Sequence, residues 1–234
     1  MPTVAPKKEV ERVLAPAGTF PARVFKFMNL GTRFQEYKGQ LKDYPDTLIN
    51  ISWELPTELN KFTVKKEDGS EEEVEKPFAV SREFTLSMGK KSNLRPFVEG
   101  IIGTQLTDDE AYNFDLEELL GKACLITIAH RKSEKNGNTY ANVISATPLI
   151  KGMEMPEAVN EQRIFNVNDS SLEDIEALPE WLRDKVKESD EYKERFDPAT
   201  AERRANIEEE LKKRGVSNED KYPEEEINPE DIPF

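Results

Sequence analysis

Five stretches in the first 150 residues have the alternation or the β-rich composition of strands. The clearest is 48–55, where Ile49, Ile51, Trp53 and Leu55 fall on one face of an extended chain, because successive strand residues point to opposite sides. This phase favours a core position for Trp53. A similar texture predicts four further strands, over residues 18–31, 78–86, 123–130 and 139–147.

Between the third and fourth predicted strands the apolar spacing becomes helical. Residues 93–101 carry apolar side chains at intervals of three and four, which predicts a short helix that ends near Gly103. A second helical turn is expected over 116–120, with Asp115 as its N-cap and Gly121 at its end. The predicted order is therefore three strands, a helical segment and two strands.

This order matches the five-stranded OB barrel, which binds ligands on a face framed by the loops between strands 1 and 2 and between strands 4 and 5. Here these loops are the long polar segment 32–46 and the basic hairpin 131–138, whose Asn136-Gly137 pair is the strongest turn signal in the chain. An SH3-like barrel or a small sandwich would give similar strand spacing and stays open as an alternative. We predict a mainly β fold, an OB-fold barrel with added short helices.

The last third of the chain is expected to be helical and then disordered. Apolar residues from Leu172 to Val186 form a helical stripe, and Pro179 within it can open a second helix. A further helical segment begins at Asp197-Pro198. The pattern allows these helices to pack either on the barrel or on another subunit. We divide the chain into a flexible N-terminal arm (1–17), an OB-fold domain (18–150), a helical acidic extension (151–215) and a disordered acidic tail (216–234).

Charge is distributed unevenly along the 234 residues. The chain holds 33 Lys+Arg and 47 Asp+Glu, a net charge of −14. Residues 1–150 account for 20 and 22 of these, a net of −2, so the remaining residues carry −12. Since 34% of the residues are charged and 36% are hydrophobic, the whole chain is not expected to form one packed globule. An almost neutral domain followed by an acidic segment is typical of an interaction tail.

Composition argues against several classes of protein. The single Cys124 excludes an internal disulfide and lies in an apolar run, as a small core residue would. His130 is the only histidine, so no soft metal-ligand cluster is expected. No apolar run reaches the roughly 20 residues of a membrane span, and the N-terminus lacks a signal-peptide core. We expect a reduced cytoplasmic protein with no metal, no cofactor and no membrane partner.

The sequence contains no recognisable catalytic signature. Residues 89–92, Gly-Lys-Lys-Ser, resemble the end of a phosphate loop, but Lys91 stands where Ser or Thr is required and Phe84 where the first Gly is required. The acidic cluster 108–110 could bind a hard cation, but helix capping explains it better. His130 has no nearby nucleophile or acid partner. We therefore expect a protein that is not an enzyme.

Binding of single-stranded nucleic acid needs flat rings for stacking and cations for phosphates, and both occur in the predicted barrel. Phe25 and Phe27 are out of phase with the apolar face of the first strand, so we expect them to be exposed. Arg82, on an otherwise apolar face, either lines a groove or pairs with an internal acid. The candidate DNA-binding residues are Arg23, Phe25, Phe27, Arg33, Phe34, Tyr37, Lys38, Lys42, Lys90, Lys91, Arg95, Arg131, Lys132 and Lys135.

The sequence ends in Asp231, Ile232, Pro233 and Phe234 after an acidic stretch. This terminus resembles the acidic tip of bacterial single-stranded-DNA-binding proteins, which end in the same four residues. In such a tip the ring fills an apolar pocket on a partner, and the terminal carboxylate pairs with a basic residue at its rim. Those proteins usually join barrel and tip by a Gly-, Gln- or Pro-rich linker. The helical extension here is more similar to bacteriophage-encoded versions.

The resemblance implies a protein that binds and protects single-stranded DNA without strong sequence preference. It also implies that the tip recruits replication, recombination or repair proteins in a bacterial cell, whether the protein is cellular or virus-encoded. One alternative is an adaptor or replication mediator that uses the same tip but binds DNA weakly, and another is an enzyme of nucleic-acid metabolism without a local motif. The near-neutral barrel predicts few phosphate contacts, so stacking would carry much of the affinity. The sequence leaves the number of subunits open.

Overall fold

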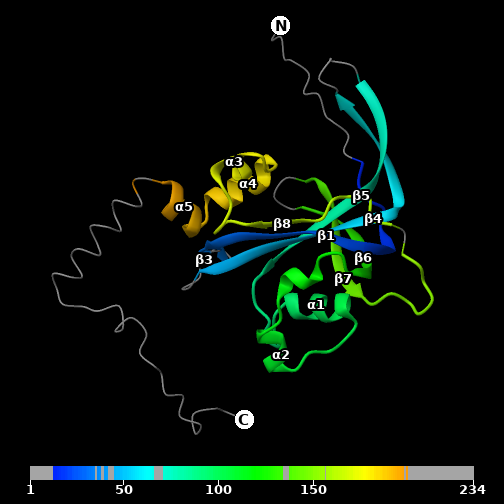
Figure 1. The fold of residues 1–234 in the computed structure, drawn as a ribbon, viewed down its shortest axis with the longest axis horizontal. Coiled ribbons are helices and arrows are strands. Elements are labelled where there is room, and N and C mark those ends of the chain that lie inside the picture. The colour runs from blue at the N-terminus through cyan, green and yellow to red at the C-terminus, as the bar shows by residue number, and fades with distance from the viewer. Residues whose placement is uncertain are drawn as a thin grey trace, which may run out of the picture.

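The computed structural model describes residues 13–199 except 35, 38–39, 42–44, 66–70, 134–136, 156 and 198. Its main feature is a curled antiparallel sheet whose hydrogen-bonded order is β5-β4-β1-β6-β7 (Figure 1). The five strands are β1 (Gly18–Arg33), β4 (Asp46–Lys65), β5 (Glu71–Thr85), β6 (Ala123–Lys132) and β7 (Thr139–Thr147). The prediction of a mainly β fold is confirmed, and the half-barrel is consistent with an OB-like barrel.

The sheet curls because its long strands contain irregularities in register. β1 shifts register against β4 at two places, and β4 shifts against β5 between Leu55 and Leu59. Such bulges bend a strand and increase its twist. The outer ends of β4 and β5 stay paired as far as Lys65 and Glu71, and they form a hairpin that projects beyond the rest of the sheet (Figure 1).

The first bulge, between Val24 and Lys26, changes which side of β1 faces the barrel core. Before it, Ala22 and Val24 point into the core. After it, the phase is reversed and Phe27 points inward, where its side chain is only 6% exposed. The expectation that Phe27 is exposed for stacking is therefore wrong, because period-two phasing does not continue through a bulge.

Helical segments between β5 and β6 cover one side of the barrel core. α1 (Leu94–Ile102) ends at Gly103 in a left-handed conformation, and the 3-10 turn η1 (Leu116–Leu119) is capped by the Asp115 side chain, as predicted. α2 (Asp108–Tyr112) lies between them. α1 approaches β7 so closely that a Cβ at Gly100 would lie 2.0 Å from the Ala146 carbonyl oxygen. Trp53 is fully buried in this core, as its phase predicted.

A second, smaller apolar cluster lies on the opposite side of the sheet from α1 (Figure 1). β8 (Arg163–Asn166) pairs in parallel with the second half of β1, and three short helices follow it: α3 (Leu172–Glu176), α4 (Glu180–Lys187) and α5 (Asp190–Phe196). These helices pack on the chain's own sheet. The cluster joins the sheet and this segment through Met28, Leu30, Leu48, Val167, Ile175, Leu182 and Val186.

Polar contacts fix the same helices to the end of β1. Gly31 adopts a positive φ of 83°, and a Cβ there would lie 2.6 Å from both Ser189 and Glu191. The Thr32 amide donates to Glu191 Oε2 at 2.7 Å. A glycine is thus required where α5 approaches the strand. Two very short strands, β2 (Glu36–Tyr37) and β3 (Gln40–Leu41), follow β1. None of the helices described reaches the length and apolarity that a membrane crossing requires.

Candidate nucleic-acid interface

Two adjoining pockets meet on β5, at Arg82 and Glu83. The first, of about 550 Å³, lies between the start of β4, the end of β5 and the loop 87–93. The second, of about 470 Å³, lies between β5 and β7 and includes Arg131 of β6. Both volumes fall in the range of ligand sites. We call the two pockets together the β5–β7 groove, since it follows the two end strands of the hydrogen-bonded sheet.

Arg82 occupies the gap between the end strands. Its Nη1 donates to the Val143 carbonyl oxygen of β7 at 2.7 Å, and its Cζ lies 4.4 Å from the Phe97 ring centroid and 5.0 Å from that of Phe84. Burial, and to a smaller extent the charge of Arg131, lower the pKa of Arg82 from its ordinary value. Of the two readings left open by the sequence, the structure supports the one in which Arg82 lines a groove.

Charge in the groove is mixed, with a cationic excess. Arg82, Lys91 and Arg131 line it, together with the carboxylates of Asp46 and Glu83. Glu83 is paired in turn with Lys185 of α4, so its negative charge is compensated from outside the sheet. A mixed lining of this kind suits a ligand that offers both phosphates and bases, because only part of the binding surface must be cationic.

An exposed aromatic side chain lies beside the groove on β7. Tyr140 is 41% exposed and stands opposite Arg131 in the register of β6 and β7. Tyr140 and Ile144 share the outward face of β7, and Ile144 lines the groove. The sequence reasoning missed Tyr140. The register of the hairpin around Gly137 could have placed it opposite Arg131, since strand pairing follows from turn position.

The first loop contributes less than the sequence predicted. Phe34 is 49% exposed at the end of β1, as expected of a stacking ring. Arg33 is instead buried, with Nη1 3.2 Å from Glu188 Oε2 and Nη2 donating to the Leu30 carbonyl oxygen at 3.3 Å. Arg33 therefore anchors the C-terminal helices, and the expectation of an exposed cation is wrong. The side chains of Tyr37, Lys38 and Lys42 lie outside the described part of the structure.

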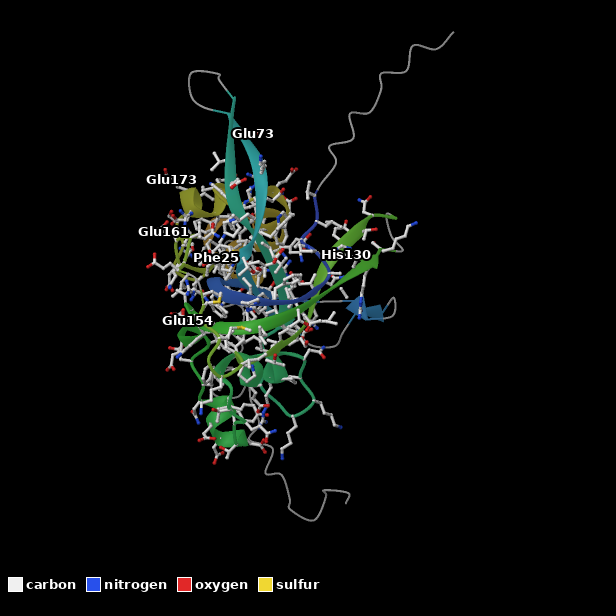
Figure 2. The ribbon with its side chains drawn as sticks, turned by 90° about the vertical axis from the view of Figure 1, so that its right-hand side faces the viewer. Phe25, Glu73, His130, Glu154, Glu161 and Glu173 are labelled. Carbon is white, nitrogen blue, oxygen red and sulfur yellow. The ribbon has the colours of Figure 1, made fainter. Side chains whose placement is uncertain are left out.

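Arg23 and Phe25 lie away from the groove, on the barrel half of β1. Arg23 Nη1 is 3.9 Å from Oε1 of the fully buried Glu54, whose Oε2 accepts hydrogen bonds from the Asn160 amide at 2.8 Å and side chain at 2.9 Å. Phe25 sits at the bulge, half-buried, with Lys26 Nζ 5.8 Å from its ring centroid. Figure 2 shows Phe25 well apart from His130, which is on β6 beside Arg131.

Of the three cations predicted before α1, only Lys91 lines the groove. Arg95 is buried and holds the turn between α1 and α2, with Nε 3.0 Å from Glu99 Oε1 and Nη1 2.8 Å from Asp108 Oδ1. Lys90 Nζ lies 2.9 Å from Asp108 Oδ2. Hydrogen bonds from Arg95 hold the pKa values of Asp108 and Glu99 below their ordinary range. Arg95 is a structural residue here, contrary to the prediction.

Two of the three cations predicted in the last hairpin are exposed to solvent. Arg131 and Lys132 are exposed on β6, whereas Lys135 lies outside the described residues.

The single cysteine and the single histidine take no part in the groove. Burial raises the pKa of the Cys124 thiol to about 12, so this thiol is inert at neutral pH. His130 Nε2 lies 2.8 Å from the Ala15 carbonyl oxygen. Within the part of the chain described, no three His, Cys, Asp or Glu side chains are grouped to hold a metal ion.

Two comparisons with known proteins found no relative. No protein-family model matches the chain, and no curated protein is significantly similar to it in sequence. The interpretation of the groove therefore depends on its own geometry and on the sequence motifs.

Proposed function

We propose that the chain binds single-stranded DNA in the β5–β7 groove of a five-stranded OB barrel. The observation that carries this proposal is the placement of Arg82 on β5, Tyr140 on β7 and Arg131 on the neighbouring β6, around the gap between the two end strands of the curled sheet. In OB folds the ligand face lies over the second and third strands, between the first and last loops. β4 and β5 are the second and third long strands, and the groove runs along β5 toward the last hairpin.

The charges predict the balance of forces in such a complex. Each phosphate neutralised on a single strand contributes about 0.7 to the slope of log affinity against log salt. With three lining cations and two carboxylates, a modest slope is expected. Stacking on rings such as Tyr140 and Phe34 is worth roughly 1–3 kcal/mol per base. Stacking rather than charge would then supply most of the affinity, with little sequence preference.

The test is binding of fluorescent oligo-dT to the full chain across a range of salt concentrations, with a duplex of equal length as comparison. The variant Lys91→Ala/Arg131→Ala should lower the salt slope by about 1.4, from 0.7 per phosphate. Arg163→Ala is the matched control, because Arg163 is exposed on β8, outside the groove, and pairs with Glu161. The proposal would be overturned if Arg163→Ala lowered the salt slope as much as Lys91→Ala/Arg131→Ala, or if the duplex bound more tightly than oligo-dT.

The C-terminal tip completes the proposed function. Asp231, Ile232, Pro233 and Phe234 lie outside the described residues, so this part rests on the sequence resemblance alone. We propose that the tip recruits replication, recombination or repair proteins to DNA held by the barrel. The second candidate is an adaptor that binds DNA weakly, because a net charge of −14 is unfavourable for binding an anionic strand. An adaptor would bind partners through the tip and give no salt-dependent signal with oligo-dT.

A further inference from the structure

A half-exposed tryptophan lies on α4, four residues before the lysine that pairs with Glu83 of the groove. The Trp181 side chain is 50% exposed, which is unusual for the largest apolar ring. Lys185, one helical turn later, has its Nζ 5.9 Å from the Trp181 ring centroid. The same ammonium group forms an ion pair with Glu83 of β5. Glu83 lines both pockets of the groove.

The packing of α4 fixes the direction of this pair. Leu182 and Val186 are buried against the sheet in the second apolar cluster, so α4 cannot rotate without exposing them. Trp181 and Lys185 are four residues apart and therefore share a face of the helix. Since Lys185 reaches Glu83, this face is directed toward β5. The helix thus carries an exposed ring and a cation along the edge of the groove.

We propose that α4 forms a wall of the single-stranded-DNA site, with Trp181 stacking on a base and Lys185 compensating Glu83. This inference rests on the proposed function, because it needs a strand in the β5–β7 groove. A large ring is the best stacking platform that a protein offers for bases. Without Lys185 the Glu83 carboxylate would repel phosphates at the junction of the two pockets.

The two tryptophans of the chain make the test direct. Trp53 is fully buried in the barrel core, so a change in emission on adding DNA reports on Trp181. Titration of the full chain with oligo-dT should quench emission, and Trp181→Phe should abolish the quenching. Trp181→Ala should weaken binding about five- to a hundredfold, while Trp181→Phe, which keeps a ring, should weaken it less.

Matched variants separate stacking from general damage to the helices. Leu172→Ala removes a side chain of similar exposure, 47%, from α3 and should leave the affinity unchanged. Lys185→Ala should weaken binding severalfold, and Glu83→Gln/Lys185→Ala should restore it, because the uncompensated carboxylate has been removed. Far-UV circular dichroism and thermal unfolding check that each variant is folded.

The outcomes distinguish this inference from the function on which it rests. If oligo-dT binds and depends on Arg131, but emission is unchanged and Trp181→Ala binds like wild type, the α4 wall is refuted and the groove stands. If oligo-dT does not bind at all, the proposed function itself fails, and the wall with it. Quenching together with a loss confined to the Trp181 and Lys185 variants would support the proposal.

Discussion

Leu182→Ala should release the C-terminal helices from the sheet while leaving the barrel folded. Leu182 is buried between α4 and the outer side of β1, in the same cluster as Met28 and Leu30. The change removes most of a buried side chain and leaves a cavity, which costs about 2–5 kcal/mol. Helices as short as α3, α4 and α5 are not stable alone in water. Because these helices depend on packing against the sheet, a loss of this size should weaken their attachment strongly.

The assay is urea unfolding followed by tryptophan emission in two backgrounds. In the native background both Trp53 and Trp181 emit, whereas in Trp181→Phe only the buried Trp53 does and reports on the barrel core. The difference between the two unfolding curves is the Trp181 signal, which reports on α4. With a loss of about 2–5 kcal/mol and a slope of about 1–3 kcal/mol per molar urea, Leu182→Ala should lower the midpoint of the Trp181 signal by about 0.7 M or more. The Trp53 midpoint should move less, because the barrel cluster does not include Leu182.

Leu172→Ala serves as the control, because an exposed position on α3 should change stability by no more than about 0.5 kcal/mol. Two results would refute the reasoning. An unchanged Trp181 midpoint in Leu182→Ala would mean that the second cluster does not hold α4. Equal shifts of both signals would mean that β1 couples the helices and the barrel into one cooperative unit.

Three further predictions concern separate parts of the chain. Arg95→Met should destabilise the folded chain most at neutral pH. Arg95 lowers the pKa of Asp108 and Glu99 in the folded state. Its ion pairs therefore stabilise the fold fully above the ordinary carboxyl pKa of about 4. The difference in thermal midpoint between Arg95→Met and wild type should shrink as the pH falls through the lowered pKa values of the two carboxyl groups. A difference that stayed constant with pH would contradict this prediction. Cys124, with its pKa raised to about 12, should resist a thiol reagent until urea unfolds the barrel, and rapid native labelling would be inconsistent with burial. Phe234→Ala should weaken partner binding at least tenfold in a pull-down, as expected for the anchor of a short peptide, and should not weaken oligo-dT binding.

The sequence by itself determined the elements that depend on local periodicity. The helix α1 and its end at Gly103, the β6–β7 hairpin and the core position of Trp53 all follow from spacing and turn chemistry within short windows. These features are local because side-chain phase and backbone conformation are set by neighbouring residues. The sequence also supplied the tip motif and the uneven charge, which no fold is needed to see.

Only the tertiary structure decided which of the polar and aromatic residues are available to a ligand. A bulge in β1 moved Phe27 into the core, and ion pairs with distant acids took Arg33 and Arg95 out of the candidate site. Helix packing brought Lys185, with Trp181 beside it, to Glu83 of β5. The partner of Arg33 is 155 residues away in the chain. Contacts of this range depend on the path of the whole chain, and a window of sequence carries no signal for them.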